Sequence, residues 1–249
     1  MKKILSIIFA LSFYIVSNAQ KASIDTASDF RNHLFSRNKV SFGIKAGIGY
    51  STIYGKDIGY VFAEDKATCQ PGYHFGLIVD NKIGTHFWLK HELIFNHKIA
   101  GVQLSDSING RYSSKLTMNY LELQPFNAAF QSKGFQVYAG PYISALLGAK
   151  IQRKDNNGNA FGDSGIFGAP NNDESENKYL QKLDFGINIG LEYQLPIGVS
   201  IGAKYTHGLT DIFQYASSYV NGDPQTDNIK IYNRGWMVSI GYFFKNGKN

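Results

Sequence analysis

The side chains in this sequence that are best suited to catalysis or binding are charged residues that recur at alternating positions among apolar ones. Glu92 and Glu122 fall on segments that we expect to be neighbouring strands, so they could imitate the carboxylate pair of a general acid–base enzyme. An isolated buried charge is very costly, so in a narrow enclosed interior these groups must pair with one another. We therefore predict an interior network of salt bridges made of Lys45, Lys90, Glu92, Glu122, Asp184, Glu192, Lys204 and Arg234.

Three histidines could indicate metal or nucleophile chemistry. His91 and His97 are six residues apart on one expected strand, about 20 Å, so they cannot chelate the same ion. His207 with Asp211 would suit an outer-membrane protease or lipid deacylase, but no partnered nucleophile or acid can be placed beside them. The acidic turn at residues 154–159 lacks the bidentate glutamate of a calcium loop. We expect no enzyme activity, no metal and no cofactor.

The elements that must position these side chains are β-strands, because apolar residues recur with period 2. In the first expected strand, Val40, Phe42, Ile44, Ala46, Ile48 and Tyr50 alternate with Ser41, Gly43, Lys45, Gly47 and Gly49. The same alternation predicts strands at 73–79, 87–96, 135–147, 183–193, 199–209 and 235–244. Segment 116–123 changes face midway, and a bulge near Asn119 and Tyr120 would restore its pattern.

The connections between these strands alternate in length. Residues 51–71, 99–114, 152–178 and 213–228 are long and polar, whereas 80–84, 131–134 and 194–198 are short turns. Long external loops and short periplasmic turns are typical of outer-membrane barrels. We predict an all-β fold, an eight-stranded antiparallel up-and-down transmembrane β-barrel. Eight strands leave an interior that side chains can fill, which argues against an open pore and against substrate access to a catalytic pair.

The two faces of the strands show which one meets lipid. The polar face is rich in glycine, which weakens a water-exposed strand but suits the crowded interior of a narrow barrel. The apolar face carries aromatic residues near strand ends, as expected for girdles at the lipid–water boundaries. These aromatic residues are Tyr50, Tyr73, Phe87, Phe95, Tyr193, Trp236, Tyr242 and Phe244. The apolar face is therefore expected to contact lipid.

The first residues have the features of a cleavable signal peptide over 1–19. A basic start is followed by an apolar run at 4–16, and small residues Ser17 and Ala19 precede the expected cut before Gln20. The apolar run, about 13 residues, is too short to span a bilayer as a helix. We expect a periplasmic leader at 20–38, the barrel at 39–244 and a C-terminal tail at 245–249.

Expected partners follow from this location. The ending Gly241-Tyr242-Phe243-Phe244 is similar to the terminal signal read by the barrel-insertion machinery. The net charge of +6 would suit nucleic acid, but no basic cluster or stacking motif accompanies it, so nucleic acid is not expected. Outer-membrane lipid and periplasmic or other envelope proteins are the remaining expected partners.

Several short stretches resemble the PorT-like family of eight-stranded outer-membrane barrels of the Bacteroidetes. They are Gly72–Leu77, His91–Phe95, Asn119–Pro125, Tyr138–Tyr142, Asp184–Ile187 and Ala203–Ile212. The resemblance implies the outer membrane of a Gram-negative bacterium as the location. That family has a member tied to a secretion system, but no motif here marks that role.

The sequence therefore predicts an integral outer-membrane barrel with a structural or surface-binding role, whose long loops meet ligands. One alternative is an accessory component of a secretion or transport assembly, contacted through the periplasmic turns and residues 20–38. A second alternative is an outer-membrane lipid-modifying enzyme or protease.

Overall fold

The structure is a computed structural model that describes residues 40–164, 180–213, 218–220, 223–225 and 230–244. The chain divides into Met1–Asn38 and Lys39–Asn249, and all described residues belong to the second unit. The expected signal peptide, the leader and the C-terminal tail lie outside the described residues. Within the described ranges, no helix has the length and apolar character needed to cross a membrane.

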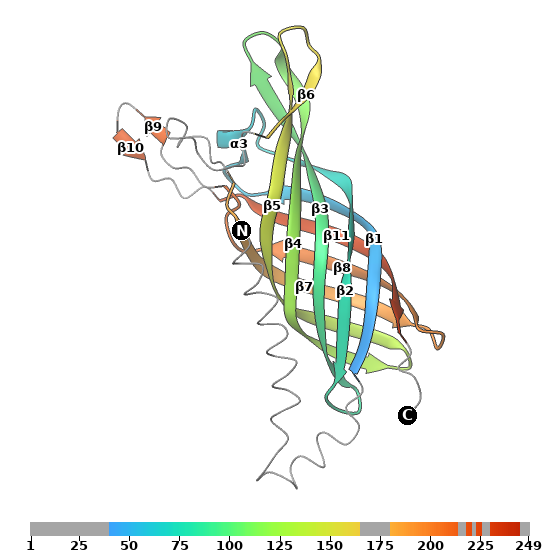
Figure 1. Ribbon diagram of the computed structural model, residues 1–249. Helices are drawn as coiled ribbons and strands as arrows, with labels where there is room; N and C mark the ends of the chain where they lie inside the picture. The colour runs from blue at the N-terminus through green and yellow to red at the C-terminus, as the bar shows by residue number, and fades with distance from the viewer. Residues whose placement is uncertain (1–39, 165–179, 214–217, 221–222, 226–229, 245–249) are drawn as a thin grey trace. The chain divides into compact units, whose positions relative to one another are not determined.

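Eight antiparallel strands close into a ring, which confirms the predicted fold (Figure 1). The ring order is β4-β3-β2-β1-β11-β8-β7-β5, and pairing between β4 and β5 closes it. The strands are β1 (Val40–Tyr54), β2 (Thr68–Lys82), β3 (Phe87–Asp106), β4 (Gly110–Ser132), β5 (Phe135–Lys154), β7 (Leu183–Gln194), β8 (Val199–Gly208) and β11 (Tyr232–Phe243). Smaller elements are α3 (Ile58–Val61), β6 (Ala160–Asp163), β9 (Ser218–Val220) and β10 (Asp223–Gln225).

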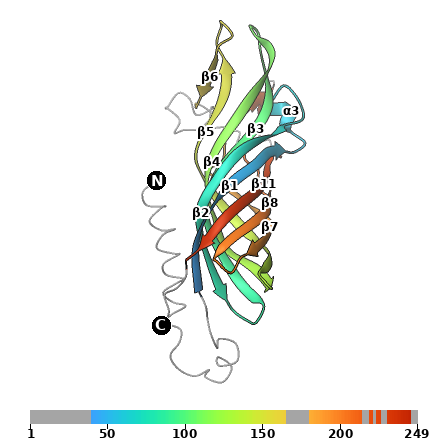
Figure 2. The same cartoon turned by 90° about the vertical axis from the view of Figure 1, so that its right-hand side faces the viewer.

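The predicted loop at 99–114 is wrong, because β3 and β4 stay paired there as a hairpin. Their ladder continues to the pair Asp106 and Gly110, with Ser107, Ile108 and Asn109 at the tip. β5 is also longer than expected and pairs with β6 beyond the ring. Figures 1 and 2 show both hairpins extending past the ring at the same end. A strand beyond the bilayer no longer needs an apolar outer face, so the period-2 signal stops while the hydrogen-bonded ladder continues.

The opposite end of the ring carries the short turns that the sequence predicted. In the β4–β5 turn, Lys133 and Gly134 have φ angles of 50° and 84°. Positive φ at both central residues is the conformation that joins two twisted antiparallel strands most tightly. Gly198, with φ 92°, lies in the β7–β8 turn. Short turns at one end and long connections at the other are the arrangement typical of outer-membrane barrels, in which the long connections lie outside the cell.

The predicted irregularity in β4 lies at the expected place, but the extra residue is on its neighbour. Asn119 pairs with Gly148 and Tyr120 pairs with Leu146, so the bulged residue is Leu147 of β5. Consequently β4 does not change face there. Leu116 and Met118, which the bulge was meant to bring to the lipid side, share their inward parity with Tyr120 and are buried.

The outer surface of the ring is apolar, and its inner surface is predominantly polar. Exposed apolar side chains include Phe42, Ile44, Ile48, Phe75, Leu77, Ile187, Ile189, Leu191, Ile201, Val238 and Ile240. Seven of the eight aromatic residues expected at the lipid boundary are exposed, whereas Phe95 is half-buried and stacks on Phe75 at a 5.1 Å centroid distance. This inverted arrangement is stable only where the outside solvent is itself apolar.

Candidate functional site

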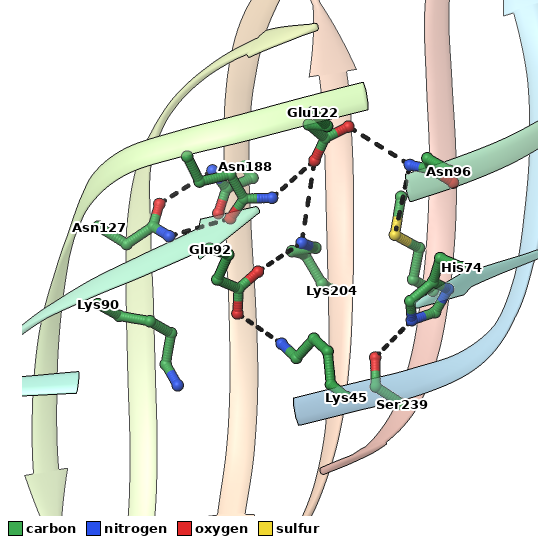
Figure 3. Close-up of polar contacts among 12 residues, drawn as sticks. Lys45, His74, Lys90, Glu92, Asn96, Glu122, Asn127, Asn188, Lys204 and Ser239 are labelled. Carbon is green, nitrogen blue, oxygen red and sulfur yellow. Dashed lines mark hydrogen bonds and ion pairs between the residues drawn. The ribbon is translucent and has the colours of Figure 1, made fainter. Parts of the chain in front are cut away.

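The interior of the barrel holds a chain of charged side chains whose signs alternate at every step, and Figure 3 shows its central part, from Lys45 through Glu92 and Lys204 to Glu122. In order along the chain they are Asp80, Lys90, Glu192, Lys45, Glu92, Lys204, Glu122 and Lys98. The successive nitrogen–oxygen distances are 3.0, 3.3, 3.8, 2.5, 2.9, 4.0 and 3.7 Å. None of these side chains is more than 5% exposed. Every charge in the chain therefore has an opposite charge beside it.

Glu92 makes the two shortest ion pairs of the chain. Its Oε1 accepts a hydrogen bond from Lys45 Nζ at 2.5 Å, and its Oε2 accepts one from Lys204 Nζ at 2.9 Å. The three side chains come from β3, β1 and β8, and Figure 3 shows the two lysines approaching the two oxygens separately. The alternation of side-chain direction along each strand places all three side chains on the inner face, but only the closed ring brings them within hydrogen-bond distance.

Two tyrosine side chains of β5 occupy the lumen next to glycines of the neighbouring strand β7. Tyr138 pairs with Gly190, and Tyr142 pairs with Gly186. A Cβ added at either glycine would meet the ring of its paired tyrosine at far less than a normal contact distance. Glycine on the inner face thus makes room for a large neighbouring side chain, which is the role that the sequence suggested for this face.

Two residues of the expected interior network behave differently from the rest. Arg234 is exposed on the outer face, so its interior placement is wrong. It shares the parity of Trp236 and Val238, which face outward, and period 2 therefore excludes it from the lumen. Asp184 is buried, but no ion pair of it is found in the described residues. Its carboxylate accepts hydrogen bonds from three neutral side chains, of which Asn233 is the nearest at 2.9 Å.

Sequence reasoning missed two members of the charged chain, Asp80 and Lys98. Both have the inward parity of their strands, but Asp80 was assigned to the turn predicted at 80–84, and the strand predicted over 87–96 ended before Lys98. Lys98 Nζ lies 3.7 Å from Glu122 and 5.3 and 5.6 Å from the ring centroids of Tyr120 and Tyr142. Aromatic faces stabilise a desolvated cation, so Lys98 is held by two rings as well as by one carboxylate. Extending the parity of Lys90 along β3 would have found it.

A second layer of the interior is apolar and lies toward the end with the long hairpins. Its members are Ile53, Ile58, Phe62, Ala100, Val102, Leu116, Met118, Tyr120, Leu146, Ala149, Ile151, Leu180, Ile212, Phe213 and Ile231. Phe62, which follows α3, packs edge-to-face on Phe213 with ring centroids 5.8 Å apart. Residues from the connections as well as from the strands therefore build this apolar layer, and no periodic pattern in the sequence predicts it.

The histidines considered for chemistry all lie outside the lumen. His91 binds a backbone carbonyl of β4, His97 Nδ1 is 2.6 Å from Asn119 Oδ1, and His207 Nε2 is 2.7 Å from the Tyr54 hydroxyl. Within the described part of the chain, no group of three histidine, cysteine or acidic side chains is placed to hold a metal ion. Each ring is thus engaged by a neighbouring hydroxyl, amide or carbonyl group.

The acidic turn between β5 and β6 uses its own carboxylate as a brace. Asp155 Oδ1 accepts hydrogen bonds from the backbone N–H groups of Asn159 at 2.8 Å and Asn157 at 2.9 Å. The Asn159 hydrogen bond is the main reason that the pKa of the Asp155 carboxyl lies below its usual value of 3.8. This internal bonding is the behaviour of an ordinary turn, which Asp commonly stabilises.

Comparison with known proteins adds a family match. A family model described as an outer membrane protein beta-barrel domain matches residues 17–214. Among solved structures, Neisserial surface protein A is 10% identical with a TM-score of 0.42, and the match covers 83% of this chain and 99% of that one. OprG from Pseudomonas aeruginosa is 15% identical with a TM-score of 0.43, covering 84% and 98%. E. coli outer membrane protein W is 17% identical with a TM-score of 0.40, covering 82% and 97%. No curated protein matches the chain.

Proposed function

Because this chain belongs to the outer-membrane protein β-barrel domain family and lies in the outer membrane of a Gram-negative bacterium, we propose that its barrel is closed to solutes and binds ligands at the cell surface. The motifs quoted above favour the PorT-like type within this family. The proposed role is structural and recognitive, with no enzymatic step and no cofactor.

The observation that carries the closed barrel is the alternating chain of eight buried charges across the lumen. A permeating ion would have to separate paired groups such as Glu92 and Lys204, whose desolvation cost is offset only while they stay together. Breaking one such pair costs about 3–5 kcal/mol, which makes a transient opening rare. The chain therefore acts as a plug rather than as a path.

The apolar layer adds a second barrier above the charges. Phe62 and Phe213 are 6% and 5% exposed, so little water reaches this level of the interior. Apolar constrictions exclude ions by dewetting, because an ion would lose its hydration shell without gaining polar partners. Two successive layers of opposite chemistry, charged and apolar, support the same conclusion.

The hairpins outside the ring support the surface-binding role. The β3–β4 hairpin is hydrogen-bonded to its tip, and β6 braces the extended part of β5. A rigid backbone that presents polar side chains beyond the membrane is a suitable scaffold for binding, since recognition residues concentrate on loops held by a stable frame. Loss of conformational entropy on binding would be small for such a preformed hairpin.

Conductance in planar bilayers tests the closed barrel. The refolded protein, shown to be inserted by heat-modifiable migration, should give no stable conductance steps, and a porin in the same bilayer serves as the positive control. Stable single-channel steps from the wild-type protein would refute closure.

Cross-linking in intact cells tests where partners bind. A photoreactive residue at Ile108, at the tip of the β3–β4 hairpin, is matched by one at Ile197, in the β7–β8 turn, since these isoleucines are 61% and 62% exposed. Adducts from position 108 alone would support surface binding. Adducts with envelope proteins from position 197 alone would instead favour the accessory component of a secretion or transport assembly.

A further inference from the structure

An aromatic and basic cluster lies on the outer face of β1, β8 and β11, and its residues take no part in the charged chain of the lumen. The Arg234 guanidinium is 5.0 Å from the centroid of the Tyr54 ring. Tyr205 and Trp236 face each other across β8 and β11 with ring centroids 4.7 Å apart. Arg234 is exposed, and it makes no ion pair among the described residues. The cluster thus offers a free cation between aromatic side chains.

Hydrogen bonds hold the cluster in one arrangement. The Tyr54 hydroxyl donates to the carbonyl of Gly208 at 3.1 Å, so His207 Nε2, 2.7 Å from the same hydroxyl, must be the donor of that second bond. In the neutral ring His207 Nδ1 is then an acceptor, which suits the Tyr205 hydroxyl at 3.3 Å. This neutral tautomer satisfies both ring nitrogens and fixes the Tyr54 ring beneath Arg234. The site is therefore preorganised without a ligand.

The register of the strands sets the height of Arg234 in the membrane. Trp236 lies in one row with Tyr50 and Tyr205, and Arg234 lies in the next row outward, beside His207. Two residues along a tilted strand correspond to about 5 Å along the membrane normal. Aromatic girdles mark the edge of the hydrocarbon layer, so a cation one row beyond them lies at the level of the lipid head groups.

We propose that Arg234 binds the phosphate of a phosphorylated glycolipid in the outer leaflet, with Tyr54 and Trp236 forming the apolar sides of the site. A planar guanidinium matches phosphate geometry and forms two charge-assisted hydrogen bonds with it. The Arg234 guanidinium lies over the Tyr54 ring with Cζ 5.0 Å from the centroid and is exposed, so its N–H groups can reach the phosphate oxygens, and the exposed Trp236 ring contacts the lipid below the phosphate. The site requires insertion in the outer membrane but not a closed lumen.

Trp236 supplies a direct signal for this binding. The chain has two tryptophans, so Trp88→Phe leaves Trp236 as the single tryptophan. The refolded single-tryptophan protein in detergent micelles is titrated with bisphosphorylated lipid A and, separately, with the same lipid after removal of its phosphates. Trp236 fluorescence should saturate with the phosphorylated lipid, and removal of the phosphates should weaken binding about tenfold, the effect of a charge-assisted hydrogen bond. Equal binding of the two lipids would overturn the proposal without any variant.

Substitutions then test the residue. Arg234→Gln should weaken binding of the phosphorylated lipid about tenfold, and Arg234→Lys should retain part of the affinity because it keeps the charge but not the planar fork. Lys115→Gln is the matched control, since Lys115 is an exposed cation on β4, outside the cluster, and should leave binding unchanged. Heat-modifiable migration confirms that each variant is folded. Unchanged binding by Arg234→Gln, or an equal loss with Lys115→Gln, would contradict a specific role for Arg234.

Discussion

Neutralising Glu92 is the sharpest perturbation of the interior charges. Glu92→Gln keeps the shape of the side chain but leaves the buried ammonium groups of Lys45 and Lys204 without their nearest anion. Their remaining carboxylates, Glu192 and Glu122, lie at 3.8 and 4.0 Å, where the attraction is weaker. Removing one partner of a buried pair costs about 3–5 kcal/mol, and here two cations are affected. We therefore expect a loss of about 4 kcal/mol or more in the free energy of unfolding.

The assay is denaturant unfolding of the refolded barrel in lipid vesicles, followed by tryptophan fluorescence and by the gel shift of the folded form. Glu64→Gln is the control, because Glu64 and Arg111 form an exposed pair at 3.8 Å whose loss should cost less than about 1 kcal/mol. Combining Glu92→Gln with Lys204→Met removes one of the two buried ammonium groups that have lost their nearest carboxylate, and should recover part of the lost stability. If Glu92→Gln costs no more than Glu64→Gln, the interior chain does not stabilise the barrel as argued.

Three further results are expected. Gly190→Ala should lower the free energy of unfolding by about 1–3 kcal/mol, because the added methyl group would overpack against the neighbouring tyrosine ring. The same denaturant titration measures this loss. Gly148→Ala is the control, since a Cβ at Gly148 meets open space and should not lower the free energy of unfolding. Phe213→Ala should speed amide hydrogen exchange in α3 and leave exchange in β7 unchanged, because it removes the edge-to-face contact between Phe213 and Phe62 in the apolar layer. Equal acceleration of exchange in α3 and β7 would argue against a separate apolar layer. The hydrogen bond from the Asn159 backbone N–H lowers the pKa of the Asp155 carboxyl below 3.8, so this bond should stabilise the β5–β6 turn above pH 3.8 and be lost as the pH falls through the lowered pKa. The amide chemical shifts of the turn should change over the same pH range. Amide shifts that do not change with pH would contradict the role of Asp155 in holding the turn.

Much of the fold was predictable because the alternation of residue types along one strand identifies its two faces without any information about its neighbours. The alternation around Lys45 identifies β1, its lipid face and its luminal face from the eleven residues at 40–50. The strand ends were less predictable. Lys98 was missed because the predicted strand ended at Asn96, where His97 interrupts the apolar half of the pattern, whereas β3 continues to Asp106. The interior placement of Arg234 failed for a different reason, since its parity already pointed outward.

The candidate site shows the same division between local pattern and closed ring. The sequence by itself determined that Glu92, Lys45 and Lys204 face inward, because side-chain direction alternates along each strand regardless of what lies opposite. Only the tertiary structure decided that both lysines bind Glu92, since they come from β1 and β8 and meet β3 through the closure and stagger of the ring. The apolar layer is likewise tertiary, because Phe62 and Phe213 lie in connections without a periodic pattern and come together only over the barrel mouth.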